Sequence, residues 1–414
     1  MKAPWPSPSS RPSWMPISER LQQLGSGVFA RVDDSKRRYL GSAAAAQRQL
    51  IDLSLGSPDL PPPPVALEAM AAALQQPASS SYCLHAATAP LREAVAAWVQ
   101  RRFAITVDPQ REVLLLVGSQ EGTAHLPLAV LNPGEQAMVL DPCYPSHRGG
   151  VVLAGGMARP LALRAEEGWR PVFERLSPEE QRQLRLLVLG YPHNPTATTG
   201  SQDWIDEALA LAGRSGAVLA HDNPYVDLAL EGEAPALLRS PGWRSNGIEF
   251  FSFSKGWGLA GFRLAFAVGA PHLIEALAKV KGVVDFNQSL ALQAGAIAAL
   301  EQAMDWPAQL LERYRQRHDL MQRCLQSSGW RVPSSSMALY QWLPLPEPLQ
   351  SLGSEAAARW LLQRSGVALT PGVGFGAAGE GWLRLALVSG TATLQTASDR
   401  LGLALRKPNP ENTV

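Results

Sequence analysis

The stretch SFSKGWGLAGFRLAFAVG, residues 252–269, decides the fold and the chemistry expected of this chain. Lys255 follows Ser252 and Ser254, and a glycine-rich turn separates it from Arg263. A lysine between an apolar strand end and such a turn loses solvation, which lowers the pKa of its amine and makes the amine a nucleophile. The hydroxyls and the guanidinium suit a phosphate dianion. A lone lysine would more often be a solvated surface residue, but these neighbours at this spacing reverse that preference.

Around this stretch, short apolar runs alternate with helical segments. The runs VLLLVG (113–118) and AMVLD (137–141) are typical of buried strands, and a helix is expected between them over 121–131. Further apolar runs lie at 151–163, 185–190, 217–222, 248–253 and 264–269. This alternation predicts an α/β fold with a mainly parallel sheet covered by helices.

Composition and charge exclude several classes of protein. With 46% hydrophobic and 18% charged residues, the 414-residue chain resembles a soluble globular protein with two or three domain-sized units. Its 37 basic and 36 acidic residues nearly cancel, so bulk charge gives no argument for nucleic-acid or membrane binding. The three scattered cysteines lack metal-type spacing and fit a reducing compartment. Without a signal-peptide core or an apolar stretch approaching roughly 18 residues, we expect a cytoplasmic protein with no metal site.

Five further motifs occur along the chain: GSQEGTAHL (118–126), DPCYPSH (141–147), GYPHNPTATTG (190–200), DNPYVDL (222–228) and GWLRLALV (381–388). Together with the Ser-x-Ser-Lys-x(7)-Arg pattern of residues 252–263, they resemble the fold-type I, class I/II aminotransferases over roughly residues 17–405. The resemblance implies a large domain, with a mainly parallel seven-stranded sheet between helices, and a smaller α+β domain.

The resemblance also implies how the chain is divided. The expected parts are a loose N-terminal segment (1–16), the N-terminal part of the small domain (17–56), the large cofactor-binding domain (57–300), the C-terminal part of the small domain (301–406) and a tail (407–414).

The resemblance assigns roles around pyridoxal 5′-phosphate (PLP). Lys255 would form the Schiff base with PLP and then move the proton between the substrate Cα and the cofactor C4′. Asp222 would pair with the pyridinium nitrogen, although a helix N-cap before Asn-Pro is an equally good interpretation of this residue. Tyr225 and Asn194 would hydrogen-bond the 3′ oxygen of the cofactor. Taken alone, Asn194 before a proline would more often be a turn residue.

Other matched residues would bind the phosphate and the ring. Tyr144 would stack on the ring, or else be an aromatic packed in a proline turn. Ser119 and Gln120 begin a helix whose N-terminus favours an anion, although an ordinary N-cap is common at such positions. The resemblance also implies that Ser252, Ser254 and Arg263 bind the phosphate. It further implies that each subunit lends Tyr82 to the phosphate of its neighbour.

The substrate would be bound by Arg384, Gly56 and Asn194. Arg384 lies in an otherwise apolar strand, where it needs a substrate carboxylate or a structural acid as its partner. A second arginine for an ω-carboxylate could be Arg31, Arg148 or another. The sequence departs from the family pattern at Ala87, where a glycine is usual, and this departure leaves the identity of the substrate undecided.

The function implied is that of a PLP-dependent aminotransferase. It would move an amino group from an L-amino acid to a 2-oxo acid by a ping-pong mechanism through pyridoxamine phosphate. The local sequence is most similar to the branch of LL-diaminopimelate and alanine/aspartate aminotransferases, which implies a homodimer with shared active sites. The alternatives are a PLP-dependent lyase of the same fold, such as a carbon–sulfur lyase, and a non-catalytic effector-binding protein.

Overall fold

The computed structural model of the chain describes residues 18–24 and 27–406. Its centre is a seven-stranded sheet with the order β2-β8-β7-β6-β5-β3-β4. Only β8 runs antiparallel to its neighbours, so the sheet is mainly parallel, as predicted. The strands are β2 (Val113–Leu116), β3 (Gln136–Asp141), β4 (Met157–Ala162), β5 (Leu184–Leu189), β6 (Val218–Asp222), β7 (Gly247–Ser252) and β8 (Ala265–Gly269).

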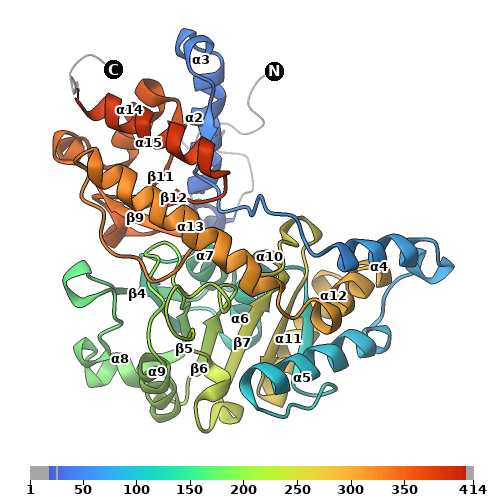
Figure 1. Ribbon diagram of the computed structural model, residues 1–414. Coiled ribbons are helices and arrows are strands. Elements are labelled where there is room, and N and C mark those ends of the chain that lie inside the picture. The colour runs from blue at the N-terminus through green and yellow to red at the C-terminus, as the bar shows by residue number, and fades with distance from the viewer. Residues whose placement is uncertain (1–17, 25–26, 407–414) are drawn as a thin grey trace.

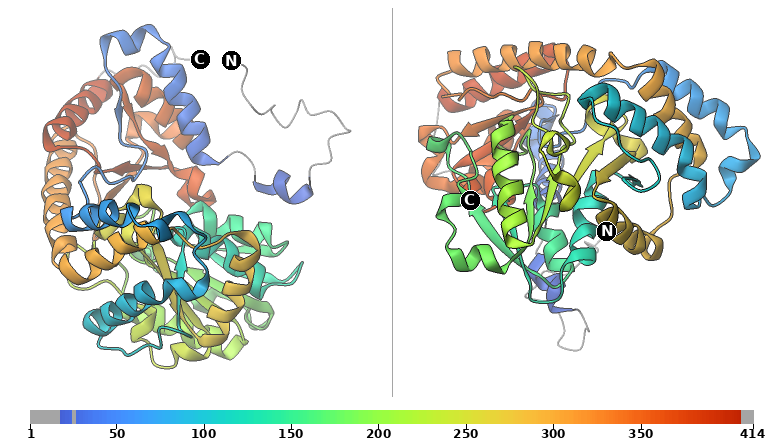
Figure 2. Two further views of the ribbon diagram at one scale, coloured as in Figure 1. Left: turned by 90° about the vertical axis from the view of Figure 1, so that its right-hand side faces the viewer. Right: turned by 90° about the horizontal axis from the view of Figure 1, so that it is seen from below.

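Helices cover both faces of this sheet because successive strand side chains point to opposite sides. Val113 and Leu115 belong to one apolar core, whereas Leu114 and Leu116 belong to the other. On the first face lie α4 (Pro64–Leu74), α5 (Ala89–Phe103), α9 (Gln202–Ser215) and α12 (Leu290–Gln302). On the second lie α6 (Ser119–Val130), α7 (Pro145–Leu153) and α11 (Pro271–Val284). Two short helices, α8 (Pro178–Gln183) and α10 (Phe253–Gly256), complete this part, and Figure 2 shows both layers.

A smaller unit forms from the two ends of the described chain. Its β-structure comprises β1 (Ile51–Asp52) paired with β10 (Val367–Ala368), and the sheet β11 (Thr370–Pro371), β12 (Trp382–Ala386) and β9 (Tyr340–Pro344). Its helices are α2 (Val28–Leu40), α3 (Ala43–Gln47), α14 (Gly353–Ser365) and α15 (Thr391–Arg406). The short helix α1 (Glu19–Leu24) packs instead against α7 of the large unit, where the Arg20 guanidinium donates to the Leu153 carbonyl at 3.0 Å. A separate apolar core joins residues 51 and 53 to residues 321–401. The division of the chain into the parts expected above remains a prediction. The predicted segments 1–16 and 407–414 lie outside the described residues.

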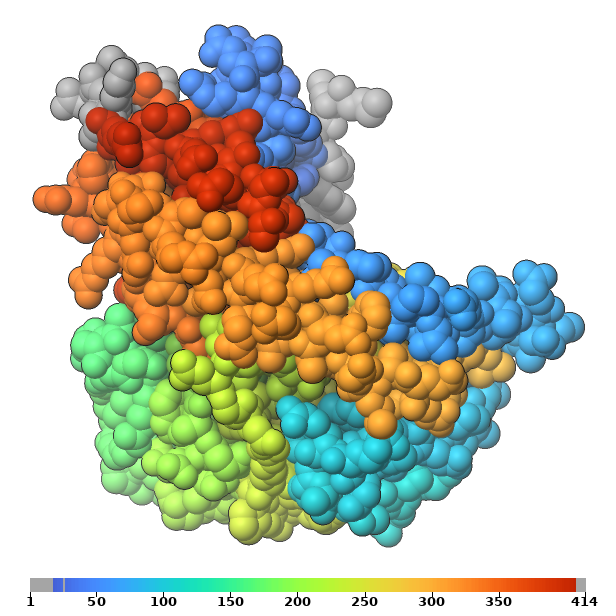
Figure 3. All heavy atoms as spheres, in the orientation of Figure 1, coloured from blue at the N-terminus to red at the C-terminus, as the bar shows by residue number. Residues whose placement is uncertain are grey.

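One long helix, α13 (Trp306–Ser327), connects the large unit with the smaller one (Figure 1). Its last turns contribute Met321 and Leu325 to the core of the smaller unit. Figure 3 shows α12 and α13, in orange, beside α4, in blue, across the face turned to the viewer. No helix within the described residues is long and apolar enough to cross a membrane.

The sequence-based elements differ from the structure mainly between residues 145 and 163. The apolar run 151–163 predicts one strand, but α7 continues to Leu153 and β4 begins only at Met157. Gly155 has a φ of +75°, a conformation that glycine adopts without strain, and the turn there separates the helix from the strand. The helix expected over 121–131, with Ser119 and Gln120 at its start, runs from Ser119 to Val130.

Candidate active site

A cavity of about 450 Å³ lies at the carboxyl ends of β5, β6 and β7, where ligands bind in open α/β sheets. Every predicted site residue except Tyr82 lines this cavity. They are Gly56, Ser119, Gln120, Tyr144, Asn194, Asp222, Tyr225, Ser252, Ser254, Lys255, Arg263 and Arg384. The cavity therefore gathers residues from most of the length of the chain, because folding brings the segments that carry them together.

Lys255 lies in the short helix α10, directly after β7. The Ser252 hydroxyl caps this helix by accepting the Ser254 N–H at 3.1 Å, which fixes the backbone just before the lysine. The Lys255 amine donates a hydrogen bond to the carbonyl oxygen of Gly56. Burial lowers the pKa of Lys255, and the positive charges of Arg384 and Arg263 lower it further, against an opposing effect of Tyr340. A larger share of the amine is thus neutral and able to act as a nucleophile or a base.

Asp222 ends β6, and its carboxylate lies 3.0 Å from Nε2 of His147. Burial alone would lower the pKa of His147, but the hydrogen bond to Asp222 raises it to about 9. The pair is therefore an imidazolium beside a carboxylate. The other oxygen of Asp222, Oδ1, is buried and has no hydrogen-bond partner within the described residues. A buried carboxylate oxygen of this kind is ready to accept a hydrogen bond from a ligand.

One end of the cavity is suited to an anion. Ser119 and Gln120 are the first residues of α6, whose N-terminal N–H groups and dipole favour negative charge. Gly118, which precedes them, has a φ of +80°, and a β-carbon at this position would overlap the Arg263 guanidinium. Glycine therefore lets the arginine approach the helix start. Together with the hydroxyls of Ser252 and Ser254, which line the same cavity, the group supplies the donors and the positive charge that an anion requires.

Arg384 of β12 is at the other end of the cavity and is only 1% exposed. Its guanidinium donates to the side-chain oxygen of Asn194 at 2.7 Å and to the carbonyl of Ser54 at 2.8 Å. No acidic side chain of the described residues forms an ion pair with it. A buried cation without an anion is costly, so this end of the cavity is suited to a carboxylate from outside.

Three aromatic rings surround the Arg384 guanidinium. The ring centres of Tyr340, Phe375 and Phe29 lie 4.5, 4.7 and 5.5 Å from its central carbon. Cation–π contacts of this kind stabilise the guanidinium and limit how it can turn. The Tyr340 hydroxyl lies 3.2 Å from that of Tyr225, which in turn accepts a hydrogen bond from the Asn194 amide.

Several of these residues were not predicted from the sequence. His147 could have been found, because it lies in the quoted motif DPCYPSH, three residues after Tyr144 and near the start of α7. Tyr340 had no local signal. The structure relates it to Gly56, because a β-carbon at Gly56 would overlap the Tyr340 hydroxyl. Only glycine therefore fits beside this tyrosine.

The structure places some other candidates outside the cavity. Tyr82 is 84% exposed and packs against Phe286, with 5.2 Å between ring centres. Ala87 lies in a short 3-10 turn, His85–Thr88, which does not line the cavity. Arg31 forms an ion pair with Glu355 at 2.7 Å, and Arg31 and Arg148 line a separate cavity of about 530 Å³. Within the described residues no cluster of three metal-ligating side chains occurs.

Comparison with known proteins gives a consistent result. The family model of class I and II aminotransferases matches residues 48–401. An LL-diaminopimelate aminotransferase of Desulforudis audaxviator is 36% identical over 387 residues, which cover 93% of this chain and 96% of the relative. The glutamate-pyruvate aminotransferase AlaC of Escherichia coli is 35% identical over 357 residues, covering 85% and 87%.

Solved structures agree with these relatives. A probable N-succinyldiaminopimelate aminotransferase of Thermus thermophilus superimposes with a TM-score of 0.85 at 38% identity, covering 91% of this chain and all of the other. The aspartate aminotransferase of the same organism, in a structure with maleate, gives a TM-score of 0.84 at 26% identity and covers 94% and 99% of the two chains. The expected fold and activity are thereby confirmed: the chain belongs to the class I and II aminotransferase family and is an aminotransferase.

Proposed function

We propose that the cavity holds PLP and that the residues lining it transfer an amino group from an L-amino acid to a 2-oxo acid. Class I and II aminotransferases depend on this cofactor, which acts as an electron sink for the bond broken at the substrate α-carbon. The observation that carries the proposal is the coexistence of three features in one cavity: the Lys255 amine, the unpaired Oδ1 of Asp222 and the anion site around Arg263.

The lining residues fit the two charged parts of the cofactor. The helix start at Ser119 and the Arg263 guanidinium would hold the phosphate. Oδ1 of Asp222 would accept a hydrogen bond from a protonated ring nitrogen, while the other oxygen stays hydrogen-bonded to His147. Tyr225 and Asn194 would hydrogen-bond the ring oxygen, and Tyr144 would contact the ring face.

The protein's own contribution to the reaction is positioning and proton transfer. Arg384 would hold the substrate α-carboxylate through a bidentate pair and so orient the α-carbon. Nζ of Lys255, whose pKa is lowered, would remove the proton from that carbon and donate it to the C4′ position of the cofactor. Gly56 lies next to this amine and leaves room for the substrate.

We further propose that two copies of the chain share their active sites, each lending Tyr82 to the phosphate end of the other. The support is that Tyr82 is 84% exposed and that Phe286, Val283 and Val284 close by are exposed as well. Such a patch on a folded chain is typical of an interaction surface. Light scattering at micromolar concentration tests the dimer, and a monomer there would contradict it.

We expect a cytoplasmic enzyme that acts on small molecules.

The amino donor and acceptor can be found by a screen. The purified protein with added PLP would be given a series of L-amino acids, each with pyruvate, 2-oxoglutarate or oxaloacetate. An aminotransferase produces the new amino acid in proportion to the acceptor consumed. A lyase would instead release products from the amino acid without any acceptor, and that result would replace the proposed function.

A further inference from the structure

A buried polar network beside the cavity has no role in the function proposed above. Glu249 of β7 is 0% exposed. Its carboxylate accepts hydrogen bonds from Nδ1 of His221 at 2.8 Å, from the Asn223 side chain at 2.9 Å and from the Leu238 N–H at 3.0 Å. Burying a carboxyl group without hydrogen-bond partners is costly. The oxygens of Glu249 are satisfied by one histidine, one amide and one backbone group.

The same histidine forms a second hydrogen bond that fixes its tautomer. The backbone N–H of Tyr191 donates to Nε2 of His221 at 3.2 Å. Because a backbone N–H can only donate, Nε2 must be unprotonated and the ring proton must lie on Nδ1. The Glu249 carboxylate can only accept, so it requires the same arrangement from the other side. The two partners therefore favour one tautomer of the ring.

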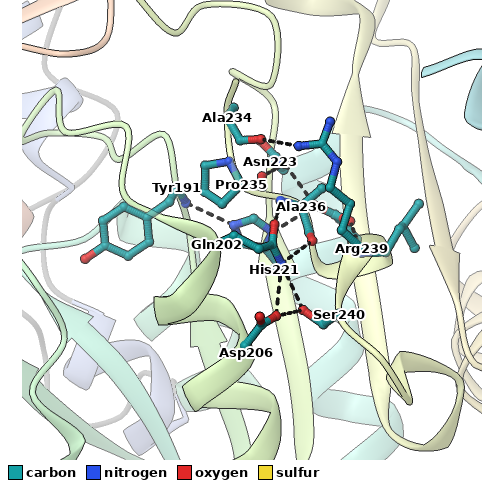
Figure 4. Close-up of polar contacts among 12 residues, drawn as sticks. Tyr191, Gln202, Asp206, His221, Asn223, Ala234, Pro235, Ala236, Arg239 and Ser240 are labelled. Carbon is teal, nitrogen blue, oxygen red and sulfur yellow. Dashed lines mark hydrogen bonds and ion pairs between the residues drawn. The ribbon is translucent and has the colours of Figure 1, made fainter. Parts of the chain in front are cut away.

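This histidine links the sheet to the turn that carries a cavity residue (Figure 4). Tyr191 begins the turn that follows β5, and Asn194 lies three residues further along it. The side-chain oxygen of Asn194 accepts a hydrogen bond from the Arg384 guanidinium at 2.7 Å, and its amide nitrogen donates one to the Tyr225 hydroxyl at 3.2 Å. The chain of contacts thus runs from a buried carboxylate to the arginine that would hold the substrate.

We propose that Glu249 and His221 are positioning residues for the substrate carboxylate. By holding the Tyr191 N–H, they fix the turn that places Asn194 against Arg384. This inference rests on the proposed role of Arg384. His221 and Asp222 are consecutive strand residues, whose side chains point to opposite sides. The contacts from Glu249 through His221 to the Tyr191 N–H, called the relay below, therefore act on the turn. They leave the Asp222 carboxylate with its own partner, His147.

Two substitutions separate the two hydrogen bonds of the ring. In His221→Asn the side-chain amide nitrogen takes the place of Nδ1, so the donor to Glu249 remains and the acceptor for the Tyr191 N–H is lost. In His221→Gln the side-chain oxygen reaches the place of Nε2, so the acceptor remains and the donor to Glu249 is lost. Both remove the ring and leave a smaller side chain.

The relay predicts that His221→Asn raises KM for both the amino acid and the 2-oxo acid by about tenfold, the value of one hydrogen bond. His221→Gln should restore KM to within about twofold of the wild type. Thermal stability should follow the opposite order, since only His221→Gln leaves the buried carboxylate short of a donor. A purely structural role would make the less stable variant also the weaker binder. Equal KM values, or a higher KM in His221→Gln, would overturn the inference.

Controls separate the relay from effects on the cofactor and on folding. Asn223→Ala removes another donor from Glu249 and should lower stability without raising KM. The affinity for PLP, from an absorbance titration, should be unchanged in His221→Asn, and a parallel loss would show that Asp222 was disturbed instead. If His221→Asn does not fold, His221→Ala also removes the acceptor for the Tyr191 N–H and should raise KM relative to His221→Gln. Equal KM values in a folded His221→Ala and in His221→Gln would overturn the relay.

The wild type and Arg384→Lys distinguish this inference from the function on which it rests. A wild-type protein that transaminates no donor in the presence of PLP would refute the proposed function, and the inference with it. If the wild type transaminates and Arg384→Lys raises KM, but His221→Asn and His221→Gln have the same KM, only the relay is refuted.

Discussion

The two ends of the cavity are built in different ways. One end, at Ser119, Gln120 and Arg263, is called the phosphate end, and the other, around Arg384, is called the carboxylate end. Ser119 begins α6 after a two-residue turn that follows β2, and the segment from Ser252 to Arg263 connects β7 to β8. The phosphate end therefore comes from strand ends of one sheet. The carboxylate end combines Arg384 of β12 and Tyr340 of β9 with side chains of α2 and of the turn after β5. Local motifs therefore form the first end, whereas the second exists only when the smaller unit packs on the large one.

This difference suggests that the two ends can be altered independently. The phosphate end depends on backbone groups and short-range contacts that the sheet fixes. The carboxylate end depends on one buried guanidinium that is contacted by four side chains, each from a different segment, and by the carbonyl of Ser54. Substitutions at one end should thus change cofactor binding, and those at the other should change substrate binding.

The largest effect is expected at Lys255, between the two ends. Lys255→Ala should lower kcat by about 10³-fold or more, since it removes the group that moves the proton. Both ends remain intact, so the KM for substrate should change little. Steady-state kinetics with excess PLP measures this. Lys279→Ala is a matched control on the exposed side of α11, where the lysine forms an ion pair with Glu275 at 2.8 Å. Full activity in Lys255→Ala would refute the assigned role.

His147 gives the next largest effect, and it is visible in the pH dependence of stability. Its pKa is raised from 6.5 to about 9 in the folded protein, mainly by Asp222 against the effect of burial. The folded state therefore holds the proton more tightly than the unfolded state. The contribution, roughly 2–4 kcal/mol, is fully present below pH 6.5 and disappears as the pH rises through about 9.

Urea unfolding of the wild type and of His147→Asn between pH 6 and about 9.5 measures this contribution. The difference in the free energy of unfolding between the two proteins should shrink as the pH rises. A difference that stays constant over this range would show that folding does not raise the pKa of His147.

A pair of arginine substitutions tests directly whether the two ends are independent. Arg384→Lys should raise KM for substrate by about thirty- to a hundredfold, because a lysine cannot form the bidentate pair. Arg263→Lys should weaken PLP binding and leave KM nearly unchanged when PLP is saturating. Absorbance titration and steady-state kinetics give the two values. If either substitution changed both values equally, the separation of the two ends would be wrong.

The smallest effect is expected for the hydroxyl of Tyr340. Tyr340→Phe keeps the ring on the Arg384 guanidinium and removes only the contact with Tyr225. The rate should fall less than about tenfold and KM should stay the same. Tyr340→Leu, which also removes the ring, should raise KM in addition. A rise in KM in Tyr340→Phe would show that the hydroxyl, and not the ring, supports the carboxylate end.

The same difference explains how much of the molecule could be predicted from the sequence. The buried strands and the Ser-x-Ser-Lys segment are local patterns, and the structure confirms the mainly parallel sheet of seven strands. The phosphate end is local too, and its residues from Ser119, Gln120 and the segment 252–263 line the cavity. Their roles in binding and catalysis remain predictions.

The remaining features depend on packing between distant segments. Phe29, Phe375 and Tyr340 meet Arg384 only in the folded chain, and no spacing in the sequence relates them. The run 151–163 contains enough apolar residues for a strand, but the turn at Gly155 divides it. His221 and Glu249 lie within apolar strands, where their pairing depends on the register of β6 and β7.

The antiparallel direction of β8 has a consequence for how the cofactor site is prepared. Because Ser252 pairs with Ala265 across β7 and β8, residues 253–264 form a return loop tied at both ends to neighbouring strands. A loop closed in this way has little conformational freedom left to lose on binding. Lys255 and Arg263 are therefore preorganised by the sheet itself, and an insertion within this loop should weaken PLP binding by loosening the site rather than by removing any contact.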